Sequence, residues 1–191
     1  MHSKQLIRKY LEVFCPMSDS DWEFFASKLI RHQFPKKSIL LEVGQVEEYL
    51  SFVENGFVRF VVPNDLEGDT FGFVFEKEFL CAYDSFVTQT KSDYLVEALA
   101  EVVLWRIRFT DLQWVYENTV VGNMLGRRVA EALYVSKIKR EKSLLIDTAA
   151  QRYHKLFLEK PIWVKQIPLK YLASYIGITP QALSRIRRRI S

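Results

Sequence analysis

The chain has 191 residues, of which 49% are hydrophobic and 26% are charged, and its formal net charge is +4. This length can bury a proper core in one large domain or two small ones. The longest apolar runs are far too short to cross a bilayer, and the charged N-terminus has no apolar signal segment, so we expect a cytoplasmic location and no membrane partner. Cys15 and Cys81 are expected to be free thiols.

The positive charge is concentrated at the C-terminal end. From Arg152 onward, nine Lys and Arg residues stand against one acid, Glu159, whereas the rest of the chain is mildly acidic. This asymmetry indicates a polyanionic partner for the C-terminal segment alone. Many solvated helices are also basic, so the charge by itself is a weak signal.

The first predicted elements are two helices followed by strands. Apolar residues at helical spacing predict a helix over residues 4–14, and Ser20 with Glu23 predicts a capping box for a second helix to about Arg31. Asn55-Gly56 lies between two strand-like runs and predicts a tight hairpin turn. Strands are predicted at residues 39–43, 49–53, 57–62, 71–75, 94–99 and 102–108. Short strands at this spacing predict a β-sandwich or a barrel-like roll, and we expect an antiparallel, jelly-roll-like β-roll.

Helical periodicity returns after the strands. Thr110 with Gln113 predicts a capped short helix over residues 111–117, and a proline-free long helix follows over residues 119–144. Gly122 and Gly126 would let another backbone approach this long helix closely. Helices of this length often pair in a homodimer by coiled-coil rules. The alternative is a helix that lies across its own β-domain.

A further helix is predicted between the long helix and the basic segment. Asp147 or Thr148 is a suitable N-cap for it, and Pro161 ends it after about Glu159.

Residues 168–189, PLKYLASYIGITPQALSRIRRR, have the pattern of a helix-turn-helix. Gly177 is where the first helix must end in a left-handed conformation, and Ile178 fills the turn. Thr179 is a good N-cap, and Pro180 suits the first position of the second helix. The predicted inward residues are Leu172, Ala173, Ile176, Leu183, Ile186 and Ile190.

The outward residues of this motif suit DNA. Gln181 and Arg185 can make paired hydrogen bonds to base edges, whereas Lys170 and the arginine run suit phosphates. The alternative is a two-helix corner of the core with a solvated basic end. The predicted DNA-binding residues are Lys170, Thr179, Gln181, Ser184, Arg185, Arg187, Arg188 and Arg189.

The order of these elements over about residues 20–190 resembles the Crp/Fnr-type transcriptional regulators. The resemblance is specific in the tail, from Gln151-Arg-Tyr to Leu183-Ser-Arg-Ile-Arg-Arg, and diffuse in the roll. It implies an α+β fold with a cyclic-nucleotide-binding-like sensor roll (residues 1–117), a long dimerisation helix (118–145) and a helix-turn-helix DNA-binding domain (146–191). It also implies a homodimer on a roughly palindromic double-stranded DNA operator. An unidentified small-molecule effector and RNA polymerase are the other partners that the resemblance leaves open.

Two departures from the family pattern stand out. Members that bind cyclic AMP hold its phosphate with a Gly-Glu pair and a later Arg, and here Cys81, Ala82 and Ser92 stand at those positions. Lys91 would point to the other face of its strand, so we expect no useful affinity for cyclic AMP. Only two residues follow Arg189, so we expect no β-hairpin wing after the recognition helix.

Other chemistry has little support. No nucleotide-binding, hydrolase or zinc-protease motif occurs, so we expect neither an enzyme nor a cofactor. The three histidines, His2, His32 and His154, are scattered, and two cysteines are too few for a cysteine-ligated cluster, so no metal site is expected. Two rivals to a regulated DNA binder stay open. One is a small-molecule or cyclic-nucleotide sensor whose helical tail contacts protein, and the other is a constitutive DNA binder with a ligand-free roll.

Overall fold

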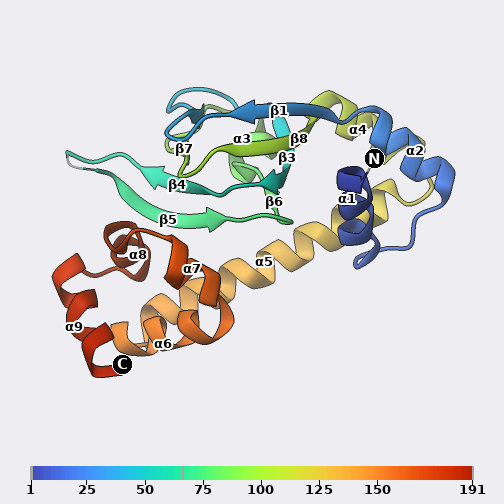
Figure 1. Cartoon of the computed structure of the whole chain (residues 1–191). Helices are drawn as coiled ribbons and strands as arrows, with labels where there is room; N and C mark the ends of the chain where they lie inside the picture. Colours follow the sequence, from blue (N-terminus) through green and yellow to red (C-terminus); the bar gives the residue numbers. More distant parts are fainter. Residues whose placement is uncertain (1, 66, 191) are drawn as a thin grey trace. The chain divides into compact units, whose positions relative to one another are not determined.

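The computed structural model describes residues 2–65 and 67–190, without the side chains of residues 2, 3 and 190 (Figure 1). The chain divides into two compact units. The first comprises residues 1–61 and 73–132, and the second comprises residues 62–72 and 133–191. The tip of one β-hairpin therefore belongs to the same unit as the C-terminal helices.

The predicted antiparallel roll is confirmed, as two four-stranded sheets (Figure 1). Every strand pair with a described register is antiparallel. The first sheet has the order β1 (Ile30–Phe34), β8 (Val102–Arg108), β3 (Tyr49–Asn55) and β6 (Phe79–Leu80). The second has the order β2 (Ile39–Leu41), β7 (Leu95–Ala98), β4 (Val58–Val62) and β5 (Asp69–Val74).

The helix predicted up to Arg31 is shorter than expected. Helix α2 (Asp19–Ser27) is capped by Ser18, whose side chain accepts a hydrogen bond from the Asp21 N–H, and not by Ser20. Strand β1 follows directly, because its pairing with β8 outweighs the local helical pattern. Strand β6 and helix α3 (Tyr83–Thr88) were not predicted either, since both are too short to show a period.

The hairpin predicted at Asn55-Gly56 is wrong. Gly56 does have a positive φ of +86°, but Asn55 does not, and the strands on either side belong to different sheets. A Cβ at Gly56 would lie 2.2 Å from the Glu101 carbonyl oxygen. Glycine is needed here for conformation and for close packing, at a turn that passes the chain from one sheet to the other.

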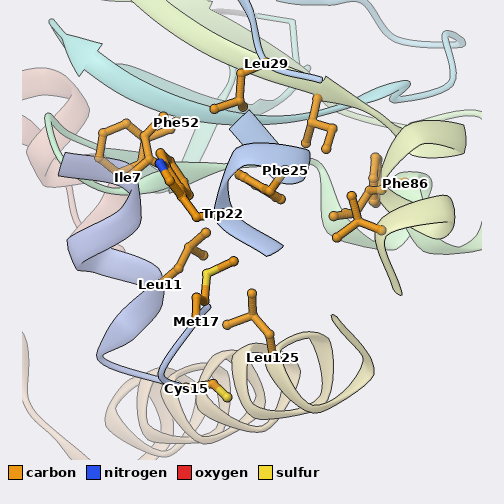
Figure 2. Packing of buried hydrophobic residues seen from close by; sticks show 13 residues of the cluster. Ile7, Leu11, Cys15, Met17, Trp22, Phe25, Leu29, Phe52, Phe86 and Leu125 are labelled. Atoms are coloured by element: carbon orange, nitrogen blue, oxygen red, sulfur yellow. The ribbon is translucent and has the colours of Figure 1, made fainter. Parts of the chain in front are cut away.

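The core of the first unit lies between the roll and its helices (Figure 2). Figure 2 shows Trp22 and Phe25 of α2 among Ile7 and Leu11 of α1 (His2–Glu12), with Phe52 from β3. The capping box predicted at Thr110 is wrong, because α4 (Phe109–Asn118) begins at Phe109 and Arg108, its N-cap residue, makes no side-chain cap bond. The core residues are Ile7, Leu11, Cys15, Met17, Trp22, Phe25, Leu29, Phe52, Phe86, Ile107, Leu112, Val115 and Leu125.

The predicted long helix is α5 (Gly122–Ile146), and its two ends have different surroundings. At the start, Leu125 is buried in the core, and Gly122 and Gly126 face Val115 and Tyr116 of α4. The glycines therefore admit α4 and not a partner helix. From residue 131 to residue 137 every side chain is exposed. The first turns of α5 pack within their own chain, as in the alternative of a helix that lies across its own β-domain. The exposed middle of α5 leaves room for a partner.

The second unit holds the later part of α5 and the C-terminal helices. Helix α6 (Ala149–Glu159) starts with the capping box of Thr148 and Gln151, which confirms Thr148 as its N-cap. Pro161 ends α6 and also begins a short helix, α7 (Pro161–Gln166), that was not predicted. Tyr153, Leu156, Trp163 and Ile167 form the buried side of these helices. No helix in residues 2–65 and 67–190 is long and apolar enough to span a membrane.

Candidate nucleic-acid interface

The predicted helix-turn-helix is formed by α8 (Leu169–Ile176) and α9 (Pro180–Ile190). Leu172, Ala173 and Ile176 are buried on α8, and Leu183 is buried on α9. Ala173 is fully buried, as predicted, and its small side chain lets the two helices pack closely. Ile186 is half-buried, and the side chain of Ile190 lies outside the described part of the chain.

The turn between the two helices has the predicted geometry. Gly177 ends α8 in the left-handed region with φ +82°, and its N–H donates to the carbonyls of Ala173 and Ser174. Thr179 Oγ1 accepts a hydrogen bond from the Ala182 N–H at 3.2 Å. Pro180 is the first residue of α9. Local side-chain and backbone chemistry therefore fixes the start of α9.

Seven of the eight predicted DNA-binding residues lie on α9 or at its N-cap, and Lys170 lies on α8. Gln181, Ser184, Arg185 and Arg188 are spaced by three or four residues along α9, so they share one helix face. Ser184 is half-buried, whereas Thr179, Gln181 and the arginines of α9 are exposed. The site residues on α9 thus form a basic, solvent-accessible part of the helix that ends in Arg187, Arg188 and Arg189.

Lys170 has a partner that the sequence did not indicate. Its Nζ lies 2.6 Å from a carboxylate oxygen of Glu67, at the tip of the β4–β5 hairpin. This hydrogen-bonded pair holds the pKa of Lys170 above its usual value. One turn along α8, Ser174 Oγ accepts a hydrogen bond from the Thr70 N–H at 2.8 Å. The hairpin tip and α8 are therefore joined at two points inside one compact unit.

The roll has a polar cluster around Glu47, next to Ala82, which we expect at a phosphate-binding position of the family that the sequence resembles. Ala82, the residue before α3, donates its N–H to Glu47 Oε2 at 3.5 Å, and Tyr49 donates its N–H to Glu47 Oε1 at 3.1 Å. Arg106 Nη2 lies 3.9 Å from the same carboxylate. Glu47 is buried, and this burial raises the pKa of its carboxyl group. A carboxylate of the chain itself thus takes an N–H group at the start of α3.

Ser92 is also engaged within the chain. It is buried, and its hydroxyl donates to the Tyr94 carbonyl at 2.8 Å. No guanidinium is supplied at this position, and Lys91 beside it is exposed. The Ala82 N–H and the Ser92 hydroxyl, at two of the three positions where we expect departures from the family pattern, are therefore already hydrogen-bonded within the chain.

Several solved structures have a fold similar to that of this chain. FixK2 from Bradyrhizobium japonicum has a TM-score of 0.69 and 16% identity, covering 85% of this chain and 84% of its own. A putative Crp/Fnr-family transcriptional regulator from Eubacterium rectale has a TM-score of 0.68 and 14% identity, covering 95% and 87%. The c-di-GMP-responsive global regulator CLP of Xanthomonas campestris has a TM-score of 0.66 and 15% identity, covering 91% of each chain.

These matches establish the fold. No protein-family description and no curated sequence matches the chain. At this level of identity the structural likeness speaks for architecture alone: the chain has the Crp/Fnr fold of roll, long helix and C-terminal helix-turn-helix that its sequence resembled.

Proposed function

We propose that this chain is a DNA-binding transcriptional regulator of the Crp/Fnr type, which acts in the cytoplasm as a homodimer. The observation that carries the proposal is the complete helix-turn-helix, in which α9 presents Gln181, Arg185 and Arg188 to solvent on one face. A helix with these residues can enter a major groove, where glutamine and arginine discriminate bases and further arginines contact phosphates. The fold of the solved regulators supports the same function.

Lys170 can make its proposed contact with a DNA phosphate only by giving up its ion pair with Glu67. Because its ammonium group is paired with Glu67, a DNA phosphate must replace that carboxylate. Both partners are about half exposed, so the exchange costs little in water. Lys170 therefore adds to affinity less than an unpaired lysine would.

The effector of this regulator is not cyclic AMP. The cation that would neutralise a cyclic phosphate is missing at Ser92, and the Ala82 N–H is bonded to Glu47. Titration calorimetry with cyclic AMP should show no binding, and micromolar affinity would contradict this point. The roll then either binds a different small molecule or has no ligand.

The function is tested by selecting DNA fragments of the source genome with the purified protein and sequencing them. We expect a recurrent, roughly palindromic sequence with half-sites about one helical turn apart. The matched control is the Gln181→Ala/Arg185→Ala double variant, whose two substitutions are at exposed positions, and it should lose the enrichment while staying folded. If the wild-type protein enriches no sequence but captures the roll's ligand or a protein, the tail is not a DNA reader and the rival sensor function holds.

A further inference from the structure

Two arginines from outside the helix-turn-helix reach the end of α8. Arg152 of α6 donates from Nε to the Ile176 carbonyl at 2.9 Å, and from Nη1 to the Asp147 carbonyl at 2.6 Å. Arg140 of α5 donates from Nη2 to the Tyr175 carbonyl. Consecutive carbonyls of α8 are thus held by α5 and α6, all within the second compact unit.

These contacts complete the hydrogen bonding at this helix end. The last four carbonyls of a helix lack partners inside the helix. In α8 the first two of them, from Ala173 and Ser174, accept from the Gly177 N–H, and Ala173 also accepts from Ile178. The other two, from Tyr175 and Ile176, are the ones that Arg140 and Arg152 take. The two guanidinium groups also face the negative end of the helix dipole.

Arg140 makes a second contact, with the ring of Tyr175. Its guanidinium carbon lies 4.0 Å from the centre of that ring, which is within the range of a cation–π pair. The same ring packs edge-on against Trp163 of α7, with centroids 5.4 Å apart. Tyr175, one residue before the end of α8, therefore contacts both α5 and α7.

We propose that Arg140 and Arg152 are positioning residues that lock the helix-turn-helix onto the second half of α5. This proposal rests on the proposed function and adds a role to it. In a dimer that pairs through α5, each α5 is followed by one helix-turn-helix. A fixed angle between α5 and α8 therefore fixes the distance between the two recognition helices. The two arginines thereby set which half-site spacing the dimer accepts, without touching a base.

The first experiment uses the protein without DNA. Hydrogen exchange of the Gly177 and Ile178 amides is compared among wild type, Arg140→Gln, Arg152→Gln and the conservative Arg140→Lys. Loss of a charged hydrogen bond at the helix end should raise exchange at these amides at least about tenfold, with Arg140→Lys in between because it keeps the charge but not the planar guanidinium with its fixed donors. Lys139→Gln, an exposed neutralisation next along α5, is the matched control and should exchange like wild type. Unchanged exchange in both glutamine variants overturns the proposal.

The second experiment measures half-site spacing. Each protein is titrated with the selected operator, with operators lengthened or shortened by one base pair between half-sites, and with a single half-site. Arg140→Gln should bind the single half-site within about twofold of wild type, yet discriminate less among spacings. A variant whose helix-turn-helix is unfolded would also lose affinity for the single half-site. Arg140→Lys is therefore measured beside Arg140→Gln.

The two experiments separate this proposal from the function beneath it. If wild type binds no duplex, the proposed function fails, and with it the role in spacing, whereas the exchange data still decide whether the arginines hold α8. If wild type binds and exchange rises in Arg140→Gln but the spacing preference is unchanged, the arginines stabilise the helix end alone and the positioning role is overturned.

Discussion

Arg185 and Arg188 lie on one face of α9, and their different depths along the helix predict different roles. Arg185 is closer to the start of α9, the part of a recognition helix that goes deepest into the groove. Arg185→Ala should therefore cost about 1–3 kcal/mol of binding free energy on the operator and relax preference at one base pair per half-site. Arg188→Ala should weaken all duplexes nearly equally and lower the salt slope by about one unit per site.

The comparison needs operator and scrambled DNA at two salt concentrations with each variant. The base-reading role of Arg185 is lost if Arg185→Ala weakens both DNAs alike. Direct readout would then fall to Gln181 and Ser184, or to the shape of the DNA.

Glu47 predicts a measurable pH dependence of stability. Burial raises the pKa of its carboxyl group in the folded chain above the value of about 4.3 expected when unfolded. The folded state then binds the proton more tightly than the unfolded state. Glu47 therefore contributes fully to the unfolding free energy below the unfolded-state pKa, and this contribution is lost as pH rises through the folded-state pKa. Between these two pKa values, the unfolding free energy of wild type should fall relative to that of Glu47→Gln.

Denaturant unfolding at a series of pH values checks this, with Glu42→Gln at an exposed site as the control. Parallel curves for wild type and Glu47→Gln would show that folding does not raise the pKa of Glu47.

At the residue level, the sequence was informative where the chemistry is local. Gly177, Thr179 and Pro180 each act on their nearest neighbours along the chain, so their roles could be predicted from position alone. The contacts of Lys170 with Glu67 and of Arg140 with Tyr175 join residues far apart in sequence. The sequence contains no local pattern that pairs residues so far apart.

Among the elements, Gly56 and Gly177 offer a matched test of why a turn needs glycine. Their φ angles are nearly equal, at +86° and +82°. A Cβ at Gly177 meets only the end of Arg152, at 3.9 Å, so Gly177→Ala should cost only the left-handed backbone penalty of about 1–2 kcal/mol. Gly56→Ala adds a clash with the Glu101 carbonyl and should cost more.

Native-state hydrogen exchange, measured in the unit that holds each glycine, gives both losses. Equal losses at the two sites would contradict the packing described around Gly56.

The same local-versus-distant distinction explains the elements. The long helix, the helix-turn-helix and six strands have periods that their own residues display. The predicted helix up to Arg31 overlaps the start of strand β1, because the pairing of β1 with the distant strand β8 has no local sequence pattern. The Asn55-Gly56 turn resembled a hairpin because sequence does not show that the chain changes sheet there.

For the whole molecule, the exposed middle of α5 predicts the homodimer. Leu133, Tyr134 and Val135 are 39%, 69% and 52% exposed, and α5 ends on the exposed Leu145 and Ile146. Exposed apolar side chains in a long helix are typical of a helix that pairs with a copy of itself.

Val135→Glu should therefore turn the dimer into a folded monomer in sedimentation equilibrium, because it places a charge in the predicted helix pair. Ser136→Glu, one residue along and also exposed, is the control and should stay dimeric. A wild-type protein that sediments as a monomer would refute the predicted pairing.

The central claim is that the C-terminal helix-turn-helix reads duplex DNA. It is tested most directly by the affinity of the wild-type protein for its selected operator and for a scrambled duplex over a range of salt concentrations. We predict a log–log slope of several units and a preference for the operator of at least about a thousandfold. Equal affinity for the two duplexes, an affinity that does not change with salt, or no binding to either would contradict it.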